Sequence, residues 1–270
     1  MKLLFIGDIV GRPGREMIKE HLGMLKERFE VDFVIANYEN ASHGFGLSAK
    51  NAQELFSYGI DCLTGGNHTW DKKEIIPLLD LEPILRPLNY PQEVAGKGIE
   101  IFEVKNEKLA VINLMGYHGM PMCENPFRVA KEIIKQLHED GIKNIFIDFH
   151  AEATAEKRGM MKLLEGDVSV IVGTHTHIGT DDIMIDKGTF YVSDVGLTGC
   201  RDNIIGMDIK APLQQFLTGI KGHYDIPKRC KRILQCVIVE IENAKAINGL
   251  KVQLYDEKSI ITKEAFIEKD

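Results

Sequence analysis

The sequence predicts an α/β protein whose strands form two mixed β-sheets. Early in the chain, apolar runs of strand length alternate with helical patterns, which favours parallel strand pairing. Later runs follow one another across short turns, which is typical of hairpins and favours a mixed, two-sheet layering. We expect residues 1–270 to form one domain, because no repeat, linker or low-complexity tract interrupts this pattern.

Short runs of apolar and β-branched residues mark the expected strands, because such runs suit a sheet that is covered on both faces. The runs lie at 3–6, 31–36, 60–64, 99–104, 109–114, 144–149, 168–172, 182–185, 189–193, 233–241 and 250–255. The turn at 105–108 predicts a hairpin, and the last two runs are expected to pair in antiparallel. The proline-containing segment 81–98 is expected to be irregular and could form a wall over the site.

Helices are predicted where apolar residues recur at helical spacing between strands. Residues 17–29 carry such a stripe after a turn at 11–14. Ser48, Asp71 and Asn125 are expected to cap three further helices that end near residues 58, 79 and 138. The segment 194–209 is expected to be a loop, and a short helix near 212–220 is possible.

Composition limits the classes of function. The chain has 33 basic and 40 acidic residues, a formal net charge of −7, which argues against bulk binding to nucleic-acid backbone. No run has the length and apolarity of a membrane span or a secretion signal. The five cysteines form no CxxC pair, and their odd number argues against a full disulfide framework. We therefore expect a reduced, cytoplasmic protein.

Metal-competent polar side chains follow several of the predicted strands. They are Asp8, Glu39, Asn40, Asn67, His68, His150, His175 and His177. In open α/β sheets, ligands bind outside the carboxyl ends of the strands. Gly173 is expected to break the last of these strands, and His175 and His177 would point the same way if the chain stays extended. The sequence therefore predicts one metal centre at this edge.

Each of these residues also has a structural explanation when taken alone. A histidine at a strand end is more often structural than a ligand, and an aspartate after a strand is more often a helix cap. The joint pattern is more specific, because segments tens of residues apart all place metal-competent groups at strand ends. Cysteine is absent from them, and oxygen and nitrogen donors favour iron, manganese or zinc.

In order and spacing these residues resemble the metallophosphoesterase superfamily, whose blocks are Asp-x-His, Gly-Asp, Gly-Asn-His, His and Gly-His-x-His. The matching positions are Asp8, Gly66–His68, His150 and Gly173–His177. Val10 stands in place of the first histidine, and Tyr38–Asn40 replaces Gly-Asp. Both departures resemble the YmdB-type subgroup, the 2′,3′-cyclic-nucleotide 2′-phosphodiesterases, and the similarity runs to about residue 255. It implies a four-layer αββα sandwich with two mixed sheets.

The resemblance also implies a two-metal phosphodiesterase. The first metal would take Asp8, Glu39, Asn40 and His177, and the second Glu39, Asn67, His150 and His175. Glu39 would bridge the two ions, and a pair of ions ~3.5–4 Å apart can hold a hydroxide in line with the leaving oxygen. Iron is the expected metal, with manganese and zinc as alternatives.

By the same resemblance, His68 is not a ligand but the proton donor to the leaving alkoxide, a role that suits imidazole. The substrate implied is a 2′,3′-cyclic nucleotide, opened to a 3′-nucleotide. The residues themselves do not separate this from other small phosphodiesters, and for His68 a structural hydrogen bond is the alternative. Tyr117 and His118 could line the substrate mouth, and Arg201 could hold phosphate; exposure to solvent is the alternative for all three. An apolar edge near 99–114 could support a homo-oligomer.

Two other functions are alternatives to this interpretation. Gly7, Gly11 and Gly14 lie between a strand and a helix and could suggest a phosphate-binding loop. Their spacing fits neither the dinucleotide motif nor the P-loop, and it leaves the histidines unexplained. The second alternative is a metal-containing regulatory or scaffold protein that binds a nucleotide or an RNA-processing partner with little physiological turnover. His68 favours an enzyme, because a pure binder needs no general acid.

Overall fold

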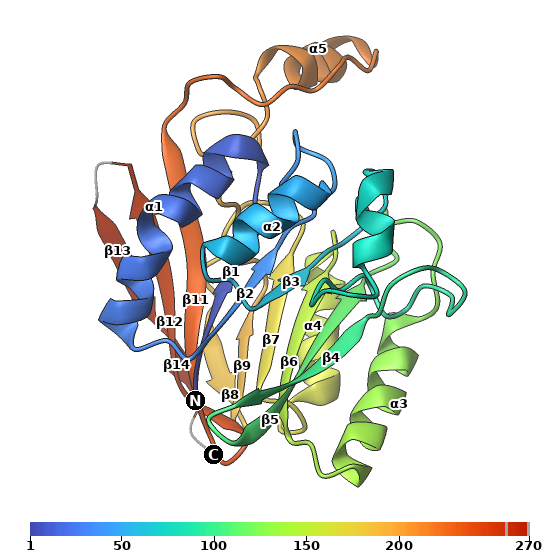
Figure 1. Cartoon of the computed structure of the whole chain (residues 1–270), viewed down its shortest axis with the longest axis vertical. Coiled ribbons are helices and arrows are strands. Elements are labelled where there is room, and N and C mark those ends of the chain that lie inside the picture. The colour runs from blue at the N-terminus through green and yellow to red at the C-terminus, as the bar shows by residue number, and fades with distance from the viewer. Residues whose placement is uncertain (257–258, 269–270) are drawn as a thin grey trace.

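The computed structural model in Figure 1 describes residues 1–256 and 259–268. Its helices are α1 (Gly11–Phe29), α2 (Ala49–Ser57), the 3-10 helix η1 (Lys73–Leu78), α3 (Pro126–Glu139), α4 (Thr154–Leu164) and α5 (Lys210–Thr218). Its strands are β1 (Lys2–Ile6), β2 (Phe33–Asn37), β3 (Cys62–Thr64), β4 (Ile99–Val104), β5 (Glu107–Met115), β6 (Asn144–His150), β7 (Val170–Thr174), β8 (Met184–Asp186), β9 (Thr189–Val192), β10 (Gly199–Cys200), β11 (Arg232–Glu242), β12 (Lys245–Tyr255), β13 (Ile260–Glu264) and β14 (Phe266–Ile267).

Within the described residues the strands form two seven-stranded sheets. The first has the order β13-β12-β11-β1-β2-β3, with β10 paired to β11, and the second has the order β14-β8-β9-β7-β6-β5-β4. In the first sheet β1, β2 and β3 are parallel, whereas β11 runs antiparallel to β1. In the second, β5, β6, β7 and β9 are parallel, with antiparallel pairs at β4/β5 and β8/β9. The predicted pair of mixed sheets is confirmed.

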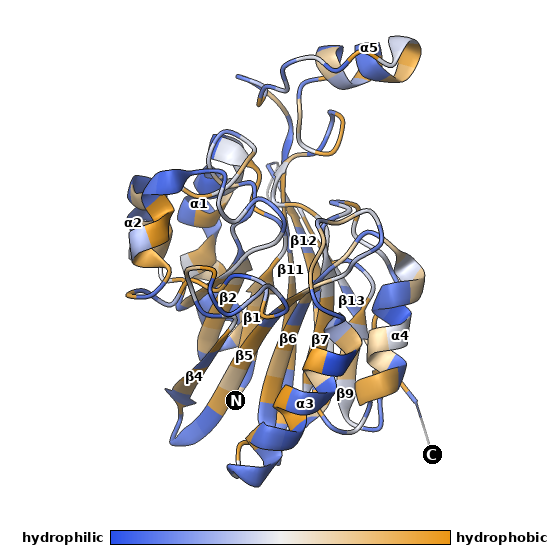
Figure 2. Cartoon of the chain, turned by 90° about the vertical axis from the view of Figure 1, so that its right-hand side faces the viewer, coloured by the Kyte–Doolittle hydropathy of each residue, from blue (hydrophilic) through white to orange (hydrophobic). Residues whose placement is uncertain are grey.

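The period-two alternation of the strands separates the hydrophobic layers. Along β1, Leu3 and Phe5 face the second sheet, where the rings of Phe5 and Phe146 lie 5.2 Å apart. Leu4 and Ile6 face the other way and pack with the apolar faces of α1 and α2. On the far side of the second sheet, α3 and α4 cover β5 and β6. The result is the four-layer αββα arrangement, with the apolar colour of Figure 2 concentrated on the strands between the helices.

Several elements differ from the sequence expectation. Helix α1 begins at Gly11, so the predicted turn at 11–14 is its first turn. Helix α4 was not predicted, because Gly159 lies in its middle and its apolar residues are crowded at one end. The predicted helix after Asp71 is the 3-10 helix η1, and no side chain caps it. Gly173 does not end its strand, since β7 continues to Thr174. β10 lies within the predicted loop 194–209, and β13 and β14 follow the expected terminal pair.

The expectation of a reduced protein is also wrong, because Cys200 and Cys230 form a disulfide. An odd number of cysteines argues against complete pairing, but it does not exclude a single disulfide. Cys62, Cys123 and Cys236 are free thiols.

No helix within the described residues has the length and apolarity needed to cross a lipid bilayer. β4 is an edge strand, as an assembly through 99–114 would need. The homo-oligomer and the single domain over 1–270 both stay predictions.

Candidate metal centre

The sheets place the predicted ligands where their parallel strands end. β1 and β2 end just before Asp8 and Glu39, β6 ends with His150, and β7 ends just before His175. Asp8, Glu39, Asn40, His150 and His177 are buried, whereas Asn67 and His175 are partly exposed. Contacts between these side chains form two groups that meet at His150 and Asp8.

The first group surrounds one nitrogen of His150. Its Nε2 lies 3.1 Å from Glu39 Oε1, 3.0 Å from His175 Nδ1 and 3.2 Å from Asn67 Oδ1. Glu39, His150 and His175 each offer one ligand atom, and these atoms all lie within 4.8 Å of one another. One carboxylate, one amide oxygen and two imidazoles therefore converge, which is a donor set that suits iron, manganese or zinc.

The second group surrounds His177. Its Nε2 lies 3.0 Å from Asn40 Oδ1 and 3.9 Å from Asp8 Oδ1. The same oxygen of Asp8 lies 3.8 Å from His150 Nδ1, so Asp8 stands between the two groups. Glu39 and Asn40 are neighbours in sequence, and one therefore belongs to each group. This arrangement brings together all seven residues that the sequence analysis named as ligands.

The pKa values show strong electrostatic coupling within the centre. Burial raises the pKa of Asp8 to about 6, although His177 and His150 act to lower it. For Glu39, burial acts to raise the pKa, but the nearby His150 holds it at about 2. For His150, burial acts to lower the pKa, but Glu39 raises it to about 9. Burial and His150 together lower the pKa of His175 to about 3. Glu39 and His150 thus form a buried ion pair, whereas burial makes the negative charge of Asp8 costly.

A buried relay orients His150. Its Nδ1 lies 2.9 Å from Thr174 Oγ1, and that hydroxyl donates to Asp148 Oδ1 at 2.7 Å. Asp148 is buried and also accepts from Thr64 Oγ1 at 2.5 Å and from Asn37 Nδ2 at 2.9 Å. Because the hydroxyl donates to Asp148, it accepts the proton that His150 carries on Nδ1. Nε2 therefore faces Glu39 and Asn67, and a metal ion bound there would take the place of its proton.

His175 and His177 reach their positions by a different route from the one expected. The chain is not extended there, because both residues have positive φ, 95° and 65°. The tight turn beyond β7 directs the first ring toward His150 and the second toward Asn40. The Nδ1 of His177 lies 2.8 Å from the carbonyl oxygen of Ile205, which leaves Nε2 facing Asn40 and Asp8.

Gly66 explains how the loop after β3 reaches the centre. A Cβ atom at this position would collide with Glu39 Oε2 and with the imidazole of His150. Only glycine lets the backbone pass this close to both residues. The next residue, Asn67, then places its amide oxygen beside His150.

His68 lies at the mouth of the centre and not among the ligand contacts. Its Nδ1 is 2.8 Å from Asp71 Oδ2, and its ring packs edge-on against Phe45 with centroids 5.0 Å apart. Its backbone N–H donates to Glu39 Oε2 at 3.3 Å. The expected helix-capping role of Asp71 is wrong: this carboxylate instead orients an imidazole, the arrangement that general acid–base catalysis uses.

An ion pair beneath the centre holds the turn that carries His175 and His177. Lys157 Nζ donates to Asp194 Oδ2 at 2.8 Å, and the two side chains are 2% and 1% exposed. The same carboxylate oxygen accepts from Thr176 N at 3.1 Å and from Thr176 Oγ1 at 2.7 Å. Asp194 therefore fixes the backbone between the two histidines.

Lys157→Met is expected to lower the free energy of unfolding by about 3–5 kcal/mol, because it leaves the carboxylate of Asp194 buried without its cation. Urea denaturation measures this. Lys162→Met on the same helix is the control, since that side chain is 49% exposed and pairs with Glu165 and Asp186 near the surface. Lys162→Met should lower the free energy of unfolding by no more than about 1 kcal/mol. Equal losses for the two variants would contradict the role given to the buried pair.

Sequence reasoning missed some residues and named others that lie elsewhere. Glu152, two positions after His150, approaches His175 Nε2 at 3.1 Å. Its position just beyond the end of a strand could have marked it as a residue of the site. Tyr117 and His118 are exposed, and their backbone N–H groups donate to Glu156. Arg201 lies over the ring of Tyr255 at 5.0 Å. Among described residues, none of these three lines the cavity at the metal centre.

A cavity of about 330 Å³ opens onto the centre, a volume within the range of small-molecule sites. One wall is polar and holds His68, Glu152 and the candidate ligands Glu39, Asn40, His175 and His177. The rest of the lining forms a mostly apolar wall and comes, apart from Phe45 and Thr176, from one later segment of the chain. The cavity can therefore hold a small molecule that has one polar and one apolar part.

The chain is similar over most of its length to several known proteins. The YmdB-like protein family matches residues 4–252. A Bacillus subtilis protein named 2′,3′-cyclic-nucleotide 2′-phosphodiesterase is 42% identical over 261 residues, covering 95% of this chain and 98% of that protein. A Mycoplasma pneumoniae putative phosphatase/phosphodiesterase is 36% identical, covering 92% and 90%. The crystal structure of a phosphatase from Mycoplasma pneumoniae superposes with a TM-score of 0.89 at 33% identity, covering 98% of this chain and 94% of that one.

Proposed function

Because this chain belongs to the YmdB-like protein family, we propose that it is a metal-dependent phosphodiesterase that opens 2′,3′-cyclic nucleotides to 3′-nucleotides. The observation that carries the proposal is the convergence of Glu39, His150 and His175 beside His68 at one cavity. Metal ligands alone would serve a binding protein. An imidazole oriented by a carboxylate at the same mouth adds the group that a hydrolase needs.

We propose that the two groups of side chains hold two metal ions, with iron expected and manganese or zinc as alternatives. Asp8, Glu39, Asn40 and His177 would hold the first, and Glu39, Asn67, His150 and His175 the second. The donor chemistry fits, because every ligand atom is oxygen or nitrogen and both carboxylates, Asp8 and Glu39, are buried. When bound, such ions neutralise the phosphodiester and activate the attacking water.

The remaining chemistry belongs to the chain itself. His68 would give a proton to the leaving 2′ oxygen, and Asp71 would hold its Nδ1 so that Nε2 can face the substrate. Phe45 packs against the imidazole and limits its rotation. The relay from Asp148 through Thr174 would keep His150 in place during turnover.

The phosphate-binding-loop alternative does not suit the structure. The N–H of Gly11, at the start of α1, donates to the carbonyl oxygen of Asn40 at 2.9 Å. A Cβ at Gly14 would meet the carbonyl oxygen of Thr198, so backbone already covers the helix start. These glycines serve close packing between α1 and the chain beside it.

The direct test is product analysis with the metal-loaded protein. We expect adenosine 2′,3′-cyclic phosphate to give adenosine 3′-phosphate, because His68 would protonate the 2′ oxygen. Chromatography against both monophosphate standards identifies the product, with adenosine 3′,5′-cyclic phosphate as the comparison substrate. Formation of adenosine 2′-phosphate would contradict the proposed cleavage of the bond to the 2′ oxygen. Faster turnover of adenosine 3′,5′-cyclic phosphate would contradict the proposed substrate.

A further inference from the structure

The apolar wall of the cavity belongs to segment 201–229, which the disulfide closes into a loop. Cys200 ends β10 and Cys230 precedes β11; their Cα atoms lie 5.6 Å apart, and their sequence separation is 30. Figures 1 and 2 show the segment rising beyond the strand ends, with α5 standing clear of both sheets. The disulfide therefore joins the two ends of the excursion at its base.

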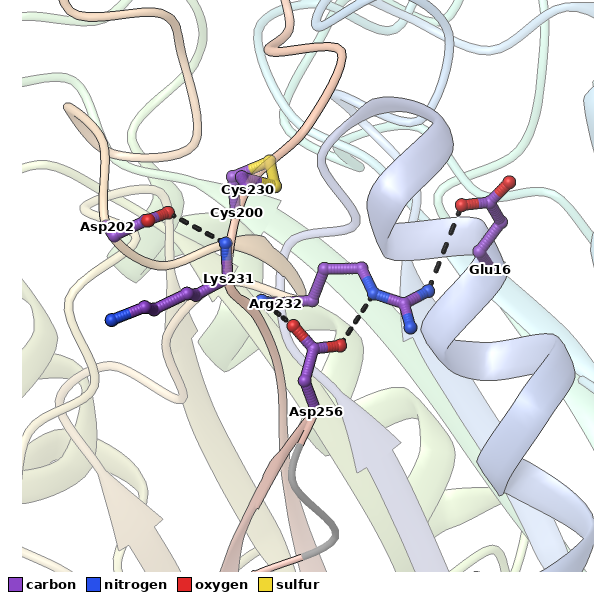
Figure 3. The surroundings of a disulfide bond; sticks show 7 residues. All are labelled: Glu16, Cys200, Asp202, Cys230, Lys231, Arg232 and Asp256. Carbon is purple, nitrogen blue, oxygen red and sulfur yellow. Dashed lines mark hydrogen bonds and ion pairs between the residues drawn. A yellow bond between two sulfur atoms is a disulfide. The ribbon is translucent and has the colours of Figure 1, made fainter.

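The base is firmly anchored on both sides of the disulfide, as Figure 3 shows. Lys231 N donates to Asp202 Oδ1 at 3.1 Å. Arg232 lies between α1 and β12, with its Nε 2.7 Å from Asp256 Oδ1 and its Nη1 3.8 Å from Glu16 Oε2. A second attachment lies at the metal centre, where the Ile205 carbonyl accepts from His177.

The turn that makes this second attachment is strained. Ile205 and Gly206 both have positive φ, 44° and 91°, and the backbone groups of Ile204 and Met207 bond to each other across them. β-branched residues rarely adopt positive φ, and such strain persists where the surroundings enforce it. The segment is thus held against the metal centre at a definite position.

From that position the segment presents apolar side chains to the cavity. They are Ile204, Ile205, Met207, Pro212, Phe216 and Tyr224. Phe216 lines the cavity and is 73% exposed, so much of its side chain is accessible to a ligand. Phe45, beside His68, adds a further aromatic side chain to the lining of the cavity.

Resting on the proposed function, we propose that segment 201–229 binds the nucleobase of the substrate, with Phe216 as its stacking platform. A cyclic nucleotide has an anionic phosphate at one end and a flat base at the other, which matches the two walls. Aromatic side chains stack on any base, because every base has a π face. The site would therefore prefer nucleosides to sugars without a base and would discriminate little among the bases.

The test compares two substrates with the same reacting ring. One is adenosine 2′,3′-cyclic phosphate, and the other is methyl riboside 2′,3′-cyclic phosphate, which has no base. Phe216→Ala is expected to raise the KM of the nucleotide roughly tenfold through lost stacking and to leave the base-free substrate unchanged. Leu217→Ala is the matched control, because Leu217 is 78% exposed on the same helix and does not line the cavity.

A binding measurement separates this inference from the proposed reaction. Adenosine 3′-phosphate is titrated calorimetrically into the wild type and Phe216→Ala, which should bind it roughly tenfold more weakly. Weaker binding supports the inference even if neither cyclic substrate is hydrolysed, a result that would refute the proposed function alone. Equal affinity in the two proteins, or an equal rise in KM for both substrates, would overturn the inference.

Discussion

Glu39→Gln is expected to lower phosphodiester hydrolysis by at least about a hundredfold. Metal stabilisation of the transition state is worth several kcal/mol, and each ~1.4 kcal/mol is a factor of ten in rate. Glutamine keeps the shape of the side chain but removes the charge that faces His150 at 3.1 Å. Steady-state rates with a 2′,3′-cyclic nucleotide, measured at saturating metal, give the size of the effect.

Glu152→Gln is the matched control for this prediction. Glu152 also approaches a candidate ligand, His175, but its side chain is 55% exposed and stands outside the buried centre. Glu152→Gln makes the same change of charge and should therefore lower the rate of hydrolysis much less than Glu39→Gln does. An equal loss in both variants would mean that the rate depends on the general negative charge of the cavity, and Glu39 would lose its special role.

His68→Ala is expected to lower kcat by about 10²–10⁴, the usual contribution of a positioned general acid. The metal content should not change, because the His68 imidazole contacts Asp71 and Phe45 and none of the candidate ligands. Asp71→Asn should lower kcat by a smaller factor, because it weakens only the orientation of the His68 imidazole. Loss of metal from His68→Ala would show that His68 is a ligand.

The sheets could be predicted because their strands are short apolar runs that leave little choice of structure. Leu3–Ile6 and Val170–Thr174 are examples, and both are buried throughout. Helix α4 could not be predicted in the same way, since Gly159 and four charged residues obscure its apolar face. Its stability comes from tertiary packing against β6 and from the Lys157–Asp194 pair, and neither is a local property.

The candidate ligands could be predicted because parallel strands deliver their carboxyl ends to one edge. His175 and His177 do lie at this edge as predicted, but a turn with positive φ places them there and not the extended chain that was expected; their role as ligands stays a prediction. The hydrogen bond between His68 and Asp71 could not be predicted, because the sequence of this turn resembles that of a helix cap. The disulfide, and the contact between His177 and Ile205, join segments about thirty residues apart and leave no local signal.

Metal content per chain tests the central claim most directly. Elemental analysis of protein purified without chelator or added metal should give about two equivalents of iron or manganese, falling sharply in Glu39→Gln. Metal near zero that stays near zero after reconstitution with iron, manganese and zinc would contradict the account. The convergence of Glu39, His150 and His175 would then be a structural ion-pair network, and the proposed hydrolysis would have no source of activated water.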